Sequence, residues 1–485
     1  TLLLYHYPSI GELIMKNIIF SLIALSVSIF AASPKGYTIE TIETPKDVFF
    51  HVAGLDIDKE GRIYCVTRYG DVWILDKGNW QHFAKGLQEP CGLLVDEDGS
   101  VVVTQKPEMT RLVDSDKDGV ADLYLNLSSA WGFHNNYHEF NFGGVKDNQG
   151  NFIGTLCLAA GPKVPGLKLS AMSTEGGYRG WAYKVSPEGK FTPIACGLRS
   201  PAGIGKNSLG EIFFTDNQGD YVATSTLQHL EKDKFYGHPI SLLDKAEYSM
   251  DQLKSLKDED FEKMRTLPIV WIPQVEVANS PGNPEWNSTN GKFGPFDNQF
   301  FIGDQTGSNI FRVTLQKVGG RYQGCVIDFM SGFQCGNIRI KFDPEGNLWA
   351  GQTSRGWASR GAKPFGLQKV VWDGKTMPFE ILDVKLNKKG FKVTFTEKIH
   401  QDDASKIKVS RWWYDYTRKY GAPKKNVEDV RISALTYCED GKSLIIECPL
   451  SKEKVYGFDF SFIHNLKGES LGNKKAYYTV INTIH

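Results

Sequence analysis

One arrangement of polar and apolar positions returns along the chain. A polar loop leads into an apolar stretch with a glycine, an acidic turn ends in a second glycine, and a β-prone stretch follows. Clear copies begin at His51, Glu89, Tyr137, Arg199 and Cys335, and a degenerate copy begins at Gly294. Short β-prone stretches between tight turns predict strands. A repeat of about 40–50 residues is typical of four-stranded propeller blades.

The closing residues of the acidic turns mark the repeat. They are Gly61, Gly99, Gly150, Gly210 and Gly346, with Asn298 in the degenerate copy. We therefore predict an all-β protein in which residues 36–376 form a six-bladed β-propeller. A β-sandwich is the alternative fold for many short strands. The widest interval contains residues 241–266, which lack Pro and Gly and are rich in Leu, Lys, Glu and Asp, so a helical insertion is expected there.

The repeat ends near Met377. Residues 377–485 contain alternating stretches such as FKVTFT (391–396) and SLIIECPL (443–450) without the acidic turn. They predict a small immunoglobulin-like β-sandwich. The aromatic and basic segment RWWYDYTRKY (411–420) either packs against the propeller, which we favour, or binds sugar or peptide.

The N-terminal segment has the pattern of an export signal. Lys16 precedes an apolar run over residues 18–30, and small residues follow. We expect a signal peptide over residues 15–32, an upstream extension over residues 1–14, and an exported mature chain without a membrane span. Lys plus Arg and Asp plus Glu number 56 each, so nothing in the charge favours a nucleic acid partner. The eight cysteines form no CxxC or CxxCH motif, which leaves a c-type haem and a cysteine-based zinc site unsupported.

Equivalent loops of a propeller surround one end of its central channel. The residues 10 to 12 positions before the turn glycines are therefore expected to converge. They are His51, Gln88, His138, Arg199 and Gln334. A ring of donors with one or two bases is typical of a ligand site, although such loops are polar in any case.

Two motifs carry a resemblance to a known family. Gly197-Leu-Arg-Ser-Pro201 and Tyr236-Gly-His-Pro239 resemble the GLRNP and YGWP motifs of the glucose/sorbosone dehydrogenase family, and Trp271-Ile-Pro273 resembles its WxP segment. Members are exported six-bladed propellers that oxidise sugars with pyrroloquinoline quinone and calcium. The resemblance implies that His138 is the catalytic base and that Arg199 contacts the quinone.

The same resemblance implies the remaining cofactor ligands. Gly219 and Asp220 correspond to the calcium site. The quinone contacts expected beside Arg199 are Gln88, Ser200, Thr306 and Arg339. Ser200 stands where the family has Asn, Thr306 lies near its lysine, and Arg339 lies near one of its two late arginines.

A longer resemblance is to a branch of secreted bacterial propellers described as membrane-bound dehydrogenase-like. It rests on the sequence motifs NYHEF (136–140), TDNQGD (215–220), GDQTGSNI (303–310), TSRGW (353–357) and YGAP (420–423). It extends from about Val48 into the C-terminal region. Because this chain encodes no haem, the electron acceptor would be external, either a cytochrome c or a quinone.

A second calcium motif lies outside that resemblance. The segment 114–122 has the form DxDxDGxxD, and its oxygens around a glycine turn suit a hard cation. The expected ligands are Asp114, Asp116, Asp118, the carbonyl of Val120, and Asp122. The alternative is an ordinary acidic turn.

We therefore predict an exported quinoprotein dehydrogenase that oxidises a sugar, an aldose or a related alcohol. His138 would take the proton from the hydroxyl, with His134 or Glu139 as substitutes, and Arg199 would stabilise charge on the reduced cofactor. The alternative is a carbohydrate- or protein-binding propeller that has lost the cofactor. A lactonase-type metal hydrolase on the same fold is a third possibility.

Overall fold

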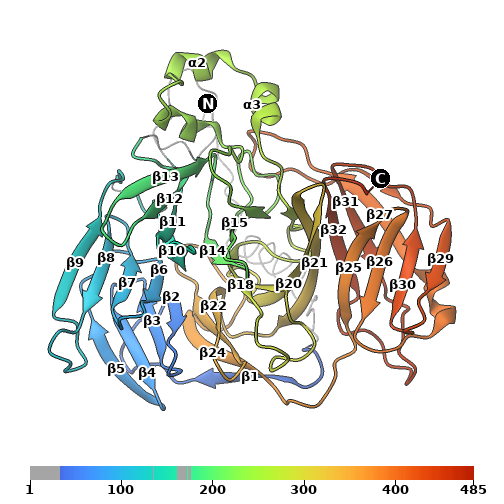
Figure 1. The fold of residues 1–485 in the computed structure, drawn as a ribbon, viewed down its shortest axis with the longest axis horizontal. Helices are drawn as coiled ribbons and strands as arrows, with labels where there is room; N and C mark the ends of the chain where they lie inside the picture. Colours follow the sequence, from blue (N-terminus) through green and yellow to red (C-terminus); the bar gives the residue numbers. More distant parts are fainter. Residues whose placement is uncertain (1–32, 135, 161–171, 173–175, 485) are drawn as a thin grey trace, which may run out of the picture. The chain divides into compact units, whose positions relative to one another are not determined.

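The computed structural model describes residues 33–134, 136–160, 172 and 176–484. The expected extension and signal peptide lie outside these residues. Residues 33–485 form one compact unit. Its strands lie mostly in antiparallel four-stranded sheets that follow one another along the chain (Figure 1).

Most of these sheets are built from four consecutive strands. The first contains β2 (Val52–Ile57), β3 (Ile63–Thr67), β4 (Val72–Asp76) and β5 (Asn79–Ala84). The second contains β6 (Gly92–Val95), β7 (Val101–Thr104), β8 (Met109–Val113) and β9 (Leu123–Ser128). The third contains β10 (Asn141–Lys146), β11 (Phe152–Leu156), β12 (Trp181–Val185) and β13 (Phe191–Cys196). The fourth contains β14 (Gly203–Lys206), β15 (Ile212–Asp216), β16 (Thr226–His229) and β17 (Val270–Trp271).

The remaining strands of the repeat close the arrangement. The next set contains β18 (Pro281–Trp286), β19 (Phe300–Asp304), β20 (Asn309–Val318) and β21 (Arg321–Ser331). The last contains β22 (Asn337–Phe342), β23 (Leu348–Thr353) and β24 (Phe365–Trp372), and β1 (Tyr37–Ile42) pairs with β24 as its fourth strand. The first strand of each set contacts the first strand of the next, and β22 contacts β2. The arrangement is propeller-like, and strand β1 from the start of the described chain joins its last sheet.

Glycine makes both the turns and the close packing possible. Gly61 and Gly346 have φ values of +82° and +95°, a region that other residues rarely adopt. Asn298, which replaces glycine in the degenerate copy, has a φ of +59°. Between the first strands β14 and β18, a Cβ atom on Gly203 would lie 2.1 Å from the backbone of Gly282. The two strands can approach this closely only because residue 203 is a glycine.

The expected helical insertion is confirmed. It contains the 3₁₀ helix η1 (Pro239–Asp244), α2 (Met250–Ser255) and α3 (Asp258–Met264). Ser249 and Gln252 form a capping box at the start of α2, which is the local reason that the helix begins there. Figure 1 shows α2 and α3 at one edge of the strands.

The C-terminal strands lie in two sheets. One contains β25 (Ile381–Asn387), β26 (Gly390–Phe395), β30 (Ser443–Glu447) and β29 (Ala434–Tyr437). The other continues from β21 through β32 (Lys475–Val480), β31 (Lys454–Asp459), β27 (Lys408–Trp413) and β28 (Lys425–Asp429). These four strands extend the set β18–β21 into one eight-stranded sheet. The 3₁₀ helix η2 (Gln401–Lys406) precedes β27.

A shared core joins this region to the repeat. Cys325 and Ile327 of β21 pack in the same cluster as Phe391 and Tyr478. The segment 411–420 packs against the repeat, as favoured from the sequence, because the rings of Tyr414 and Trp271 lie 5.2 Å apart. Among the described residues no helix is long and apolar enough to cross a membrane. The eight cysteines are unpaired.

Candidate functional site

The residues of the expected ring lie in loops that lead into the first strands of the sheets. His51, Gln88, His138, Arg199 and Gln334 precede β2, β6, β10, β14 and β22. The charge of Arg68, which directly follows β3, acts on both His51 and His138. The main-chain N–H of Gln334 donates to Gln368 Oε1 at 3.0 Å.

Of these two histidines, His138 is the exposed one. Its ring centroid lies 5.2 Å from that of Tyr137 and 6.0 Å from that of Phe140. Partial burial lowers the pKa of His138, and the positive charges of Arg199, Arg68 and Lys106 lower it further. The lowered pKa favours the neutral form of the imidazole, which is the form that can accept a proton.

Arg199 is held by two carboxylates. Its Nε lies 2.9 Å from Asp220 Oδ1, and Asp220 Oδ2 lies 2.8 Å from His238 Nε2. The carboxylate of Asp216 accepts the main-chain N–H groups of Arg199 at 2.9 Å and Ser200 at 2.7 Å. Burial raises the pKa of Asp216 to about 6. These contacts fix the loop of the GLRSP motif and the direction of the Arg199 side chain.

Three further cations lie at this end of the sheets, at positions to which neither the repeat nor the family motifs assigned a role. They are Arg68, Lys106 and Arg355. Arg68 Nη2 lies 3.3 Å from Glu89 Oε2, and Arg355 also bonds the Glu89 carboxylate. The guanidinium of Arg68 lies 4.3 Å from the centroid of Phe140, the ring beside His138.

Lys106 and Arg355 complete the cluster. Lys106 Nζ donates to the carbonyl of Asn136 at 3.1 Å, and burial lowers the pKa of its amine. The guanidinium of Arg355 lies 5.8 Å from the ring of Tyr137. One signal could have found these cations. Each lies one or two positions beyond the second strand of its sheet, after Thr67, Thr104 or Thr353.

His51 belongs to the same cluster. Its Nδ1 lies 2.9 Å from Thr353 Oγ1. Burial lowers its pKa to about 4, and the charges of Arg355 and Arg68 act in the same direction. His134 and Glu139, the expected substitutes for His138, instead pair with each other at 2.8 Å, and Glu139 is fully buried. The Glu139 carboxylate is therefore committed to His134.

Arg339 has a different environment from the one the resemblance implies. Its guanidinium donates to the carbonyls of Ala53 at 2.9 Å, Cys91 at 2.8 Å and Ala202 at 2.8 Å, and also to its neighbour Ile338. These carbonyls come from three other sheets. Arg339 of β22 therefore links its own strand to β2 and to the residues that directly precede β6 and β14.

The other implied quinone contacts lie in the expected loops. Gln88 is exposed, and its main-chain N–H donates to Gln105 Oε1 at 2.5 Å. Thr306 Oγ1 donates to Ser280 Oγ at 3.0 Å. Ser200 is buried beside Arg199.

The implied calcium ligands Gly219 and Asp220 have protein partners. The carbonyl of Gly219 accepts the N–H groups of Gly421 at 2.9 Å and Val222 at 3.2 Å. Both carboxylate oxygens of Asp220 are used by Arg199 and His238. This arrangement does not fit a calcium site, because a cation bound to the Asp220 carboxylate would lie beside the positive charge of the Arg199 guanidinium.

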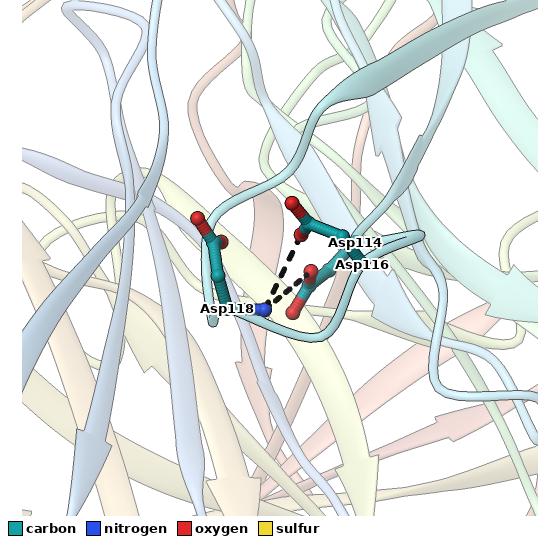
Figure 2. A group of neighbouring side chains, drawn as sticks. All are labelled: Asp114, Asp116 and Asp118. Atoms are coloured by element: carbon teal, nitrogen blue, oxygen red, sulfur yellow. Dashed lines mark hydrogen bonds between the residues drawn. The ribbon is translucent and has the colours of Figure 1, made fainter.

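The segment 114–122 fits a hard cation better. Figure 2 shows Asp114, Asp116 and Asp118 around the turn, and ligand oxygens of the three lie within 4.8 Å of one another. The main-chain N–H of Asp118 donates to Asp114 Oδ1 at 3.2 Å and to Asp116 Oδ1 at 3.3 Å. Asp122 is not part of this group, because its carboxylate accepts the N–H and the hydroxyl of Ser115.

The C-terminal region contributes one residue to the Arg199 environment. The guanidinium of Arg199 lies 5.1 Å from the centroid of Tyr420. Tyr416 Oη donates to the carbonyl of Gly237 at 2.5 Å, and the N–H of Tyr221 donates to the carbonyl of Thr417 at 2.8 Å. The segment after β27 is thus joined by hydrogen bonds to the loop that carries Asp220 and to Gly237.

Comparison with known proteins identifies a family. Residues 37–279 match the profile of a domain of unknown function, DUF7133. The chain belongs to the DUF7133 family. The sequence matches none of the curated proteins.

Solved structures share the fold of this DUF7133 chain. A Thermus thermophilus protein assigned as an oxidoreductase (glucose dehydrogenase) is 15% identical, with 69% of this chain and 100% of that chain covered and a TM-score of 0.50. The holo PQQ domain of a Coprinopsis cinerea pyranose dehydrogenase is 13% identical, with 70% and 96% covered and a TM-score of 0.50. A calcium structure of a Trichoderma reesei enzyme of family AA12 is 14% identical, with 71% and 98% covered and a TM-score of 0.50. The resemblance drawn from the sequence is confirmed at the level of the fold, and the secreted branch stays a prediction.

Proposed function

We propose that this DUF7133 protein is an exported quinoprotein dehydrogenase that oxidises a sugar, an aldose or a related alcohol. In this proposal residues 36–376 are a six-bladed β-propeller and residues 377–485 an immunoglobulin-like β-sandwich. The activity is assigned from His138, an imidazole whose pKa is lowered by partial burial and by the charges of Arg199, Arg68 and Lys106. Solved proteins of the same fold include a PQQ domain in holo form, which supports this assignment.

The residues present fit an anionic quinone. Pyrroloquinoline quinone carries several carboxylates, and its burial requires cations and N–H donors. Arg68 Nε and Arg355 Nε are buried, and neither has a hydrogen-bond partner among the described residues. Arg68 and Arg355 share the single carboxylate of Glu89, which leaves positive charge for a ligand. Arg68, Arg355, Lys106 and Arg199 would hold the cofactor, which supplies a hydride acceptor when bound.

His138 would perform the proton transfer. Its lowered pKa keeps the ring neutral, so that it can accept the hydroxyl proton beside Arg199, Arg68 and Lys106. Arg199 would orient the reacting group and stabilise negative charge, and Asp220 and His238 would hold its guanidinium in place.

Calcium belongs to the proposal at the loop of Asp114, Asp116 and Asp118. Three carboxylates around a turn provide oxygen ligands, and their mutual repulsion favours binding of a divalent cation. We expect this ion to stabilise the connection between β8 and β9. Titration of Ca²⁺ should raise the melting temperature of the protein, and Asp116→Asn together with Asp118→Asn should abolish that increase.

A non-catalytic binding propeller is the second candidate. The engagement of Gly219 and Asp220 by protein partners favours it, because the family calcium site is then missing at that position. In that case the cluster around His138 would bind a carbohydrate or a protein partner without oxidising it.

One experiment separates the two candidates. Purified full-length chain is titrated with pyrroloquinoline quinone in the presence of Ca²⁺, and dye reduction is then measured with a panel of aldoses. His138→Ala should abolish dye reduction while quinone binding persists, and Arg68→Gln with Arg355→Gln should weaken quinone binding. The exposed residues His400 and Arg431 provide matched controls, His400→Ala and Arg431→Gln. Absence of quinone binding would refute the dehydrogenase and leave the binding propeller.

A further inference from the structure

A cleft of about 370 Å³ lies beside the candidate site, between the repeat and the C-terminal segment. One wall is formed by residues 274–276, which follow the WxP segment, and the other by residues 420–424. Its volume lies within the range of small-molecule pockets in proteins, about 300–1,000 Å³. None of the sequence motifs assigned a role to this cleft.

Two features of the first wall are energetically costly. The side-chain oxygen of Gln274 is buried and has no hydrogen-bond partner among the described residues. Val275 is 65% exposed and has a φ of +68°, although a β-branched residue is strongly disfavoured in that region. Asn279 Oδ1 accepts its main-chain N–H at 2.8 Å and holds this conformation. Strain of this kind persists where the surrounding structure enforces it and is concentrated at ligand sites.

Tyr420 connects the cleft with the candidate site. Its side chain is 70% exposed, lines the cleft and lies 5.1 Å from the guanidinium of Arg199. Its backbone is bridged to Asp220, and the N–H of the next residue, Gly421, donates to the carbonyl of Gly219 at 2.9 Å. The main chain that carries this exposed ring is therefore held between Arg199 and the cleft.

We propose that this cleft is a saccharide-binding subsite, that Tyr420 is its stacking platform, and that the ligand is an oligosaccharide. One sugar unit would lie at Arg199 and His138, and the next would lie on Tyr420 and extend into the cleft. This proposal rests on the proposed function, because the sugar unit beside Arg199 and His138 is the substrate of the proposed dehydrogenase. It adds a contribution of the C-terminal region, which the family profile over residues 37–279 does not include.

The chemistry of the walls suits a sugar. A pyranose has an apolar C–H face, which packs on an aromatic ring, and hydroxyl groups at its edge, which need acceptors and donors. The Gln274 oxygen supplies an acceptor. Lys424 Nζ and Glu276 Oε1 form an ion pair at 2.5 Å within the same cleft and supply charged partners for hydroxyl groups.

Calorimetric titration of the full chain with glucose, cellotriose and maltotriose tests the proposal. At least one trisaccharide should bind more tightly than glucose. Tyr420→Ala and Gln274→Ala should each lower the ratio of trisaccharide to glucose affinity, the former by roughly 3- to 10-fold, as expected for an aromatic contact. Tyr420→Phe keeps the ring and should keep the ratio. Tyr124→Ala removes an exposed tyrosine on β9 and serves as the matched control.

The outcomes separate the subsite from the dehydrogenase. Trisaccharides that bind no more tightly than glucose, or a ratio that both cleft variants leave unaltered, would overturn the subsite even if the protein oxidises glucose. A ratio that depends on Tyr420 without any dye reduction would support the subsite and refute the dehydrogenase.

Discussion

The buried pair of Arg199 and Asp220 provides a strong test of the site geometry. Arg199 is 6% exposed, Asp220 is 2% exposed, and His238 on the other carboxylate oxygen is fully buried. The substitution Asp220→Asn removes the negative charge and retains the size of the side chain. It leaves the guanidinium of Arg199 buried without its counter-charge.

The expected loss of stability is large. At an N···O distance of 2.9 Å the gross attraction is about 6 kcal/mol for an effective dielectric constant of 20, and desolvation offsets part of it. Removing one partner of a buried pair typically costs about 3–5 kcal/mol. We expect Asp220→Asn to lower the free energy of unfolding by that amount. Asp415→Asn breaks an exposed pair with Lys425 and should cost less than about 1 kcal/mol.

Urea unfolding of the four proteins of a double-mutant cycle measures this term. The set contains the parent chain, Asp220→Asn, Arg199→Met and the double variant. The double variant should lose less stability than the sum of the single variants, with a coupling energy of about 2–3 kcal/mol. A loss for Asp220→Asn as small as that for Asp415→Asn, or a coupling energy near zero, would refute a buried ion pair at this position.

Three other perturbations have defined outcomes. The pKa of Asp216 is about 6 in the folded state, against about 3.9 in the unfolded state, so the folded state binds more protons between these two values. The free energy of unfolding, measured with urea, should therefore fall by roughly 2–3 kcal/mol as pH rises through that window. The substitution Asp216→Asn should remove this fall. Arg339→Lys keeps a cation but cannot reach the carbonyls of three other sheets, so its unfolding free energy should drop by at least about 3 kcal/mol; an unchanged value would contradict the assigned contacts. Val275→Gly relieves a positive φ, and its melting temperature should rise relative to the parent, whereas a decrease would argue against the strained backbone.

Much of the fold could be predicted from local patterns. The acidic turn places a glycine or asparagine where φ must be positive, as at Gly61 and Asn298, and the strands on either side follow from it. Residues 241–266 lack Pro and Gly and are rich in Leu, Lys, Glu and Asp, and this composition located α2 and α3. Each of these features depends on residues within a few positions of one another.

The site was predictable only in part. His138 and Arg199 could be selected as candidates because they occupy similar positions in their repeats, 12 and 11 residues before the turn glycines, and because the family motifs implied their roles, which stay predictions. Arg68, Lys106 and Arg355 occupy another equivalent position, after the second strands, where the residue types vary between repeats and no single copy indicates a site. Arg339 was taken for a ligand contact because a sequence does not show which acceptors surround a guanidinium.

Local sequence patterns alone specify a repeated antiparallel β architecture, a helical insertion, and the loops that carry the candidate site. These properties follow from residue spacing and backbone preferences, which are local. Three-dimensional packing was needed to show that Asp220 bonds Arg199 and His238, that Arg339 links carbonyls of different sheets, and that Tyr420 reaches Arg199 from the C-terminal region. These contacts join residues far apart in the chain, and their partners are chosen by packing and burial.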